Sequence, residues 1–458
     1  MTWALKALGS IVALAVPGTA WAGTCVAYAL GEPAMSPDLA KCVATAKDGD
    51  IIELMPGSHA ADQLVISHAL TIRPHVPDSS PLLVSSVPES AAVLLSLKNS
   101  SAPYLLDASG LLIIDAPDKS VHVEDVQVVP PTMSGVLVGR AFRVRAGELS
   151  LTGLSLPDET VQFVAKSVGR DEVGGALALV ESGGGLRIGA GCQLSGLSGP
   201  RVDGALVHAS GTGSSVTIEG GAKISQIDAQ RGALFVAGGA TISVRDDGSG
   251  QGPTFWALHA EHGAAIFAGK DGVIEVSDGV FLDNRVPLLS SEAVGRGGHL
   301  SADQGTLTVT GGVFAGGQAS VGGAIAGVGS DVNVLGGTFY LDRGTLGRLD
   351  SADRNQAWRG GVVWVDDGVG SLGHLELSDV ALAHGLGRYA PGDEAVGRGP
   401  PAGGAVYASE VPVSLRNGVI GGSVVVDWGS GGGFACQNCA IAATGLTVER
   451  SRARFGAG

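Results

Sequence analysis

The chain has few basic residues, with 29 lysines and arginines against 44 aspartates and glutamates, so its formal net charge is −15. A nucleic-acid-binding protein needs a basic stripe, and docking to an anionic membrane needs clustered lysine and arginine. The charge balance therefore argues against both activities. A solvated acidic surface that keeps a β-rich protein dissolved explains the charge, and a surface that collects Ca²⁺ is the alternative.

Long apolar runs are missing after the first 22 residues. Lys6 precedes the apolar stretch 8–16, and Ala20-Trp21-Ala22 supplies the small-residue pattern of a cleavage site. The stretch is too short to span a membrane as a helix. We therefore expect residues 1–22 to be a signal peptide and the mature chain to have no transmembrane segment. Export to the extracellular or outer-membrane surface follows from this expectation.

Cysteine is scarce, with five residues in all. Cys25 and Cys42 flank one short segment, and we expect them to form a disulfide worth roughly 3 kcal/mol in the chain-entropy model. For Cys436 and Cys439 the sequence leaves two alternatives, a local structural disulfide or two unreactive thiols. Cys192 is predicted to be a buried, small apolar residue.

Glycine, by contrast, is abundant at 74 of 458 residues, without the period of collagen. The stretches 306–314 and 331–339 match at an offset of 25 residues, each with alternating apolar residues followed by Gly-Gly, one residue and Phe. An internal repeat of this period indicates a solenoid, in which each unit buries its apolar face against its neighbours. At ~3.3 Å per residue, a closed rung has a perimeter of roughly 80 Å, enough for three short strands and three corners.

A glycine element recurs from residue 174 onwards, with variable insertions between copies. Its copies begin at Gly174, Asp203, Arg231, His262, Gly297, Gly322, Gly360, Gly403 and, more weakly, Gly432. We expect its glycines to allow positive φ at a sharp corner and its alanines to fit where rungs come close. The next aliphatic residue, such as Ile325, is predicted to point inward. Phe281, Phe314 and Phe339 are predicted to form a second inward column.

Residues 23–50 are predicted to form an N-terminal cap with one short helix. Ser36 can serve as its N-cap and Pro37 as its first residue, while Leu39, Val43 and Ala46 share one face. Such a helix covers the end of the stack, where unpaired strand edges invite aggregation.

The cap leads into Asp48-Gly49-Asp50-Ile51-Ile52-Glu53-Leu54, followed by Pro56-Gly57-Ser58 and two short apolar strands. Over residues 36–74 this order resembles the opening of right-handed parallel β-helix proteins of the pectate-lyase-like superfamily. The resemblance implies an all-β, right-handed parallel β-helix with a short N-terminal capping helix. We expect the β-helix to span residues 51–458, with irregular rungs over 51–173 and Gly-Gly-Ala-type repeats over 174–458.

The second half also resembles the repeats of the polymorphic outer-membrane protein family. Gly322-Gly323-Ala324-Ile325 and Phe281-Leu282-Asp283-Asn284 match its two elements, whereas Phe314 and Phe339 lack the following Asn. This resemblance implies an exported passenger that adheres or shields at a cell surface. The family's membrane barrel is missing from the sequence.

Candidate catalytic groups are few. Asp246-Asp247 and Asp366-Asp367 each precede a glycine, which favours turns over paired catalytic carboxylates. His259, Glu261 and His262 lie near Phe255 and Trp256, and could be a metal site or a general base beside a sugar-stacking aromatic, although a polar corner loop explains them as well. The Asn-x-Asp, Gly-His-Gly and Arg-x-Lys motifs of polygalacturonase-like hydrolases are missing. The sequence assigns no catalytic, cofactor-binding or metal-ligating residue.

Two functions follow from these observations. The first is a non-enzymatic exported surface protein that adheres, binds or shields, with cell-surface glycans or proteins as partners. The second is a carbohydrate-active enzyme of the pectate-lyase-like group, a polysaccharide lyase or glycoside hydrolase. The sequence stops inside a rung at Gly458, and we expect further rungs to follow in the natural polypeptide.

Overall fold

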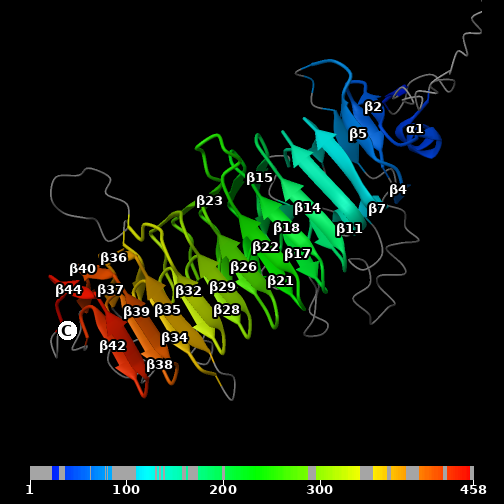
Figure 1. Ribbon diagram of the computed structural model, residues 1–458. Coiled ribbons are helices and arrows are strands. Elements are labelled where there is room, and N and C mark those ends of the chain that lie inside the picture. Colours follow the sequence, from blue (N-terminus) through cyan, green and yellow to red (C-terminus); the bar gives the residue numbers. More distant parts are fainter. Residues whose placement is uncertain are drawn as a thin grey trace, which may run out of the picture.

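The computed structural model describes residues 23–29, 37–61, 63–77, 79, 81–84, 110–128, 132–133, 136–137, 140–156, 161–162, 174–198, 202–286, 295–340, 354–368, 373–387, 402–425 and 431–453. These residues form an elongated stack of short strands in which the order along the chain is the order along the long axis (Figure 1). The predicted signal peptide lies outside the described residues. The chain is a parallel β-helix, as the repeat predicted.

Three sheets, A, B and C, run along the axis, and sheet A holds two rows of strands. The first row of sheet A contains β4 (Leu64–Ile66), the first halves of β7 (Gly110–Glu124) and β11 (Arg140–Thr152), β13 (Ala178–Val180), β17 (Val207–Ser210), β21 (Leu234–Ala237), β25 (Ile266–Ala268), β28 (Leu300–Asp303), β31 (Ile325–Val328), β34 (Val363–Asp366), β38 (Val406–Ser409) and β42 (Phe434–Gln437). The second row contains β1 (Thr24–Ala27), β2 (Asp50–Leu54), β5 (Leu70–Pro74), the second halves of β7 and β11, β14 (Gly184–Ile188), β18 (Ser215–Ile218), β22 (Thr241–Val244), β26 (Val273–Val276), β29 (Thr306–Val309), β32 (Asp331–Val334), β35 (His374–Ser378), β39 (Val413–Arg416) and β43 (Ile441–Thr444).

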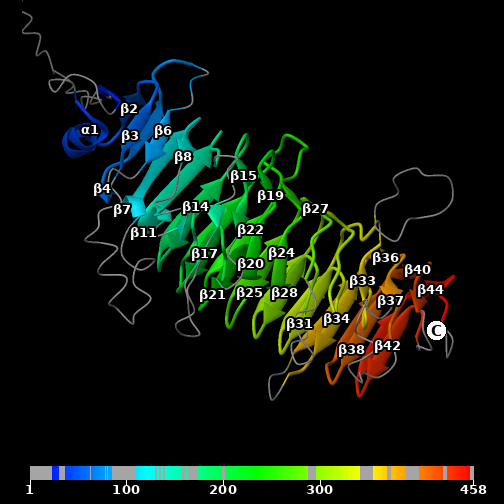
Figure 2. The same cartoon turned by 180° about the vertical axis from the view of Figure 1, so that it is seen from behind.

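Sheets B and C complete the rungs on the reverse side (Figure 2). Sheet B contains β3 (Ser58–Ala60), β6 (Leu82–Val84), β8 (Gln127–Val128), β15 (Gln193–Ser195), β19 (Lys223–Ser225), β23 (Thr254–Trp256), β27 (Val280–Leu282), β30 (Val313–Ala315), β36 (Ala381–Ala383), β40 (Val419–Gly421) and β44 (Thr447–Glu449). Sheet C contains β9 (Thr132–Met133), β10 (Val136–Leu137), β12 (Val161–Gln162), β16 (Leu197–Ser198), β20 (Asp228–Arg231), β24 (His259–His262), β33 (Gln356–Ala357), β37 (Leu386–Gly387) and β41 (Val424–Val425). Among the described strands, every pairing is parallel except that of β9 with β10.

The rung differs from the predicted three strands, because sheet A contributes two. Residues 207–231 hold β17, β18, β19 and β20 in one turn of the solenoid. Gly211 and Gly213, with φ of 92° and 82°, make the turn that separates β17 from β18. Glycine reaches this conformation without the steric cost of a β-carbon, so a tight turn can divide one face into two short strands.

Aliphatic side chains in register fill the interior of the stack. Ile325 on β31 pairs with Leu300 on one side and with Val363 on the other, and all three side chains are fully buried. Burial of each such side chain stabilises the fold by about 1.5–3 kcal/mol relative to exposure. The predicted inward position of Ile325 is confirmed.

A column of phenylalanines lies beneath sheet B, also as predicted. Ring centroids are 4.7 Å apart between Phe281 and Phe314 and 5.0 Å apart between Phe314 and Phe339. The column extends one rung further than the sequence suggested, because Phe255 stacks on Phe281 at 4.5 Å. All four rings are fully buried.

The two glycines of the repeated corner have different roles. Gly322 has φ of 62°, the left-handed conformation that glycine favours. Gly323 has no such constraint, but a β-carbon there would lie 2.2 Å from the carbonyl oxygen of Gly361 on the next rung. We expected Ala324 to occupy the close approach between rungs. The second glycine occupies it instead, because the backbones of successive corners meet at that position.

Buried asparagines support the turn between sheets B and C. Asn284 accepts a hydrogen bond from the Leu258 N–H at 2.9 Å and donates to the Phe255 carbonyl at 3.2 Å. Asn355 donates to the carbonyls of Phe314 and Phe339, at 3.0 and 2.8 Å. Asn355 therefore supports the turn in the rung of Phe339, as Asn284 does in the rung of Phe281. The sequence missed Asn355 because residues 341–353 separate it from Phe339.

The rung between these two asparagines has Gly317 at the position that asparagine occupies in its neighbours. The His299 side chain lies in the space left there. Asn284 Nδ2 lies 3.0 Å from His299 Nδ1, and His299 Nε2 lies 3.3 Å from Asn355 Oδ1. Asn355 Oδ1 also accepts from the Gly317 N–H at 2.9 Å, so it is the acceptor and His299 Nε2 carries the proton. A β-carbon on Gly317 would lie 2.7 Å from the His299 ring. The imidazole thus occupies the space that a third asparagine side chain would need.

The N-terminal end of the stack is covered by α1 (Leu39–Thr45), as expected, and strand β1 precedes it (Figure 1). The helix N-cap is Asp38, whose carboxylate accepts from the Lys41 N–H at 2.8 Å. The prediction of Ser36 as N-cap and Pro37 as first helical residue is wrong. The Pro37 carbonyl instead accepts from the Tyr28 N–H at 2.9 Å, which holds Pro37 outside the helix.

Two disulfides and one free thiol account for the cysteines. Cys25 of β1 is bonded to Cys42 of α1, which confirms the prediction and ties the cap to the first strand. Cys436 is bonded to Cys439, so the first of the two alternatives holds. Cys192 is free and buried, and burial raises the pKa of its thiol to about 11.

The last described strands of the sheets are β42, β43 and β44. Ile441 and Val448 are 50% and 39% exposed, whereas their partners one rung earlier, Val413 and Ile420, are 1% and 2% exposed. The expectation of further rungs beyond Gly458 stays a prediction.

The inward column predicts a sharp contrast between two substitutions. Ile325→Asp places an unpaired carboxylate in the core and should lower the melting temperature severely or prevent folding. Asn333→Asp puts the same group on the outer side of β32, where the side chain is half-buried. This substitution should change the melting temperature little. Thermal unfolding followed by far-UV circular dichroism measures both. Similar melting temperatures for the two variants would contradict the inward assignment.

The buried imidazoles predict that acid destabilises the fold. Burial lowers the pKa of His299 to about 3 and those of His208 and His262 to about 4. An unfolded histidine titrates near 6.5, so below that pH the unfolded state takes up protons that the folded state does not bind. Each histidine should therefore remove roughly 1.4 kcal/mol of stability per pH unit as the pH falls below 6.5.

Urea unfolding at pH 7.5 and pH 5 measures this slope. His299→Gln should flatten it by about 2 kcal/mol over that interval. His68→Gln changes a side chain that is 43% exposed and serves as the control. A His299→Gln slope equal to that of the unaltered chain would show that His299 is not a buried neutral base.

Candidate binding face

The outer side of the second row of sheet A carries a continuous line of polar side chains, one from each rung. This polar row consists of Arg187, Thr217, Ser243, Glu275, Thr308, Asn333, Glu376 and Ser414, in register across adjacent strands. Alternation along each strand produces it: Ile242 and Val244 point inward, and Ser243 between them points outward. The row repeats at about 4.8 Å, the spacing of neighbouring strands.

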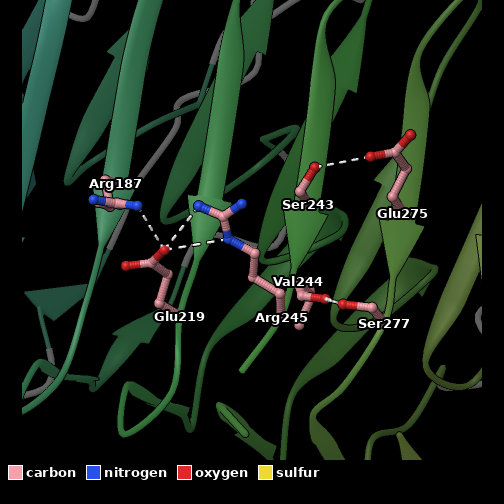
Figure 3. Close-up of polar contacts among 7 residues, drawn as sticks. All are labelled: Arg187, Glu219, Ser243, Val244, Arg245, Glu275 and Ser277. Atoms are coloured by element: carbon pink, nitrogen blue, oxygen red, sulfur yellow. Dashed lines mark hydrogen bonds and ion pairs between the residues drawn. The ribbon is translucent and has the colours of Figure 1, made fainter. Parts of the chain in front are cut away.

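Charged side chains bridge several rungs of this face (Figure 3). Glu219 Oε1 lies 2.9 Å from Arg187 Nη2 and 2.9 Å from Arg245 Nη2, so one carboxylate joins two arginines from different rungs. Ser243 Oγ donates to Glu275 Oε2 at 3.0 Å. The arginine side chains are 42% and 47% exposed. Ion pairs as exposed as these add little stability, so they order the face more than they hold the fold.

A second carboxylate between two arginines lies nearer the N-terminus. Glu181 accepts two hydrogen bonds from Arg143, at 2.8 and 2.7 Å, and Arg145 Nε lies 3.7 Å away. The hydrogen bond from Arg143 lowers the pKa of Glu181 below its usual range. Each of the two groups has one carboxylate and two guanidinium groups and is therefore locally positive, although the chain is acidic overall.

The predicted cluster of His259, Glu261 and His262 does not converge on one point. These residues belong to β24 of sheet C, so the expected corner loop is a strand. His259 is exposed, with Nδ1 3.0 Å from Asp228 Oδ1. His262 lies beside the Phe267 ring at 6.1 Å, and burial together with nearby arginines lowers its pKa to about 4. The two histidines differ in surroundings, which disfavours one shared metal or base.

The two aromatic residues near this cluster, Phe255 and Trp256, also lie in different surroundings. Phe255 belongs to the buried phenylalanine column, whereas Trp256 is 45% exposed on the outer side of β23. Trp256 alone of the two could stack on a ligand. It lies on sheet B, away from the polar row on sheet A.

The first Asp-Asp pair lies in a turn, as the sequence favoured: Asp246 and Asp247 accept from the backbone N–H groups of Gly250 and Ser249, at 3.0 and 2.9 Å. Asp366 is the last residue of β34 and accepts from the Gly368 N–H at 3.1 Å, and Asp367 accepts from the Gly373 N–H at 3.4 Å. Carboxylates engaged in this way stabilise turns and are not poised as a catalytic pair.

Within the described residues, no group of three or more His, Cys, Asp or Glu side chains could hold a metal ion. In the same part of the chain, no helix is both long and apolar enough to cross a membrane. Comparison with known protein families, with curated proteins and with solved structures found no match to this chain.

Sequence reasoning missed the polar row and the two arginine–glutamate groups. Partners in them are far apart in the chain, 26 residues for Glu219 and Arg245 and 38 for Arg143 and Glu181. The signal was nonetheless in the repeat: once the inward positions are aligned, the residues between them must share the outer face.

Proposed function

We propose that this chain is an exported, non-enzymatic surface protein that binds cell-surface glycans or proteins along the outer side of sheet A. The polar row supports the proposal most directly. It offers hydroxyl, amide and charged groups at a constant spacing over many rungs, which suits an extended ligand lying along the axis. The likeness of the repeats to polymorphic outer-membrane proteins, and the signal-peptide pattern of residues 1–22, point in the same direction.

The two arginine–glutamate groups add specificity to this face. A carboxylate that holds two guanidinium groups fixes their positions before a ligand arrives, so less side-chain ordering opposes binding. The remaining N–H donors of the arginines can face acceptor groups of the ligand. A face of this kind recognises a shape and a spacing, and it needs no deep pocket.

A carbohydrate-active enzyme is the alternative that the sequence left open. Its test is incubation of the mature chain with acidic polysaccharides, followed by measurement of unsaturated and reducing ends. Turnover above a heat-denatured control would overturn the non-enzymatic proposal.

The binding proposal predicts that hydroxyls of the polar row contribute to affinity. The triple variant Thr217→Val, Ser243→Ala and Thr308→Val keeps the strand shape but removes three hydroxyls. We expect at least tenfold weaker binding, because each lost hydrogen bond is worth about 0.5–1.5 kcal/mol. The measurement is saturation binding of the labelled mature chain to intact cells and to immobilised glycans and surface proteins.

The matched control carries Ser225→Ala and Thr254→Val, outward positions on β19 and β23 of sheet B. It should bind as the unaltered chain does. Equal loss in both variants would show that binding does not use sheet A, and the lack of saturable binding to any surface would refute the proposal.

A further inference from the structure

A second outer surface follows the edge where sheet C turns into sheet A. One residue from each rung stands there, directly before the glycine corner, and successive residues form parallel bridges. This corner row consists of Asp203, Arg231, His262, Arg296, Val321, Arg359 and Ala402. Three of its seven members are arginines, in a chain of net charge −15.

The corner row lies beside aromatic side chains on the outer side of the first row of sheet A. The Arg231 guanidinium carbon is 5.3 Å from the Phe235 ring and 5.5 Å from the Phe267 ring. The Arg359 guanidinium carbon is 4.3 Å from the Trp358 ring and 4.8 Å from the Tyr407 ring. Stacking on aromatic rings holds a guanidinium in place while its N–H groups stay free to point outward in its plane.

The residues around Arg359 form an apolar cluster separate from the core. It contains Val321, Ala326, Trp358, Trp364, Ala402 and Tyr407, all buried. In a solenoid the core lies inside the sheets, so a second cluster on the outside needs another explanation. Ala326, Trp364 and Tyr407 are neighbours in register on β31, β34 and β38, which places the cluster over three successive rungs.

Buried polar atoms without hydrogen-bond partners gather at the same edge. Six such atoms of the described residues lie on or beside the corner row: His262 Nδ1, Arg296 Nε, Ser301 Oγ, Ser320 Oγ, Arg359 Nε and Trp364 Nε1. Ser301 and Ser320 are 0% exposed and Trp364 is 8% exposed. The arginine and tryptophan atoms can only donate, and both hydroxyls can donate as well.

The glycine corner brings the end of one segment close to the strand that follows it. A β-carbon on Gly297, next to Arg296, would lie 3.1 Å from the Ser301 β-carbon. A β-carbon on Gly360, next to Arg359, would lie 3.2 Å from the Trp364 α-carbon. Arg296 and Arg359 are two rungs apart, about 10 Å between backbones.

Unpaired donors in a buried region destabilise a fold by about 1–3 kcal/mol each, and most buried polar groups in proteins are paired. The unpaired atoms of Arg296, Arg359 and Trp364 can only donate, so a partner that satisfies them must accept hydrogen bonds. The ion pairs of the arginines at this edge indicate which of them remains available to a charged partner. Arg231 is paired with Asp203 and Arg296 with Asp303, whereas Arg359 forms no ion pair with any described carboxylate.

We propose that the edge around Arg296, Arg359 and Trp364 is an oxyanion-binding site. Its ligand is a carboxylate, sulfate or phosphate group, held by guanidinium, indole and hydroxyl donors beside the aromatic cluster. The site lies on a different surface from the polar row and goes beyond the proposed function. It holds or fails independently of whether the chain binds cells.

Isothermal titration of the mature chain with inorganic sulfate, at constant ionic strength in chloride, tests the proposal. We expect saturable binding that weakens at least tenfold in Arg359→Gln. Arg73→Gln alters an arginine that pairs with Glu53 and belongs to neither row, and it should bind sulfate as the unaltered chain does. Because Arg359→Gln also disturbs packing, Trp364→Phe provides a gentler variant that replaces the indole by a smaller aromatic ring and removes the Nε1–H. It should weaken binding severalfold.

A uronic-acid oligosaccharide and a neutral oligosaccharide of equal length identify the source of the anion. Binding of the uronate more than tenfold tighter than sulfate assigns the site to a glycan-borne anion, and equal binding assigns it to a free anion. The proposal is overturned by equal binding of the charged and neutral oligosaccharides, by equal sulfate affinity in Arg359→Gln and the unaltered chain, or by no heat of sulfate binding at all.

Discussion

Backbone pairing between successive rungs is the constraint on which the rest of this fold depends. Because the strands are parallel and in register, a residue at one position of a rung lies about 4.8 Å from its counterpart on the next. Side chains of the same kind must therefore pack against one another in successive rungs. Phe281 stacks on Phe314, Ile325 lies between two other aliphatic residues, and the glycine corners meet at their backbones. The same rule aligns the polar row and the corner row on the outside.

Features that repeat along the axis could be predicted from the sequence, because each copy reinforces the others. The parallel β-helix, the inward position of Ile325 and the phenylalanine column were all found in this way, whereas the Cys25–Cys42 disulfide followed from the short segment between its two cysteines. Features that depend on a single rung could not be predicted from the sequence. Asn355 is displaced from its phenylalanine by a long insertion, and His299 compensates from another corner for a missing asparagine. Nothing in the local sequence marks either residue as part of a ladder.

The candidate sites were harder to predict for a different physical reason. Inward positions must be apolar, so they can be recognised in the sequence. Outward positions tolerate almost any residue, so the sequence shows no regular pattern at them. The partners of Glu219 become neighbours only when the rungs stack. The carboxylate pairs and the histidine cluster drew attention because they are close in sequence. The structure uses the first for turns and divides the second between two surroundings.

The direction of the rung-to-rung hydrogen bonds also gives the molecule a mechanical character. These bonds lie along the long axis, so a pull on the two ends loads every rung in series while the bonds within one rung share the load. The weakest rung then yields first and alone. A folded rung contributes about 4.8 Å to the length, whereas its 25 to 30 residues span roughly 80–100 Å when drawn out. Under tension such a chain is a stiff rod that lengthens in discrete steps, and each step relieves the load on the rungs that remain folded.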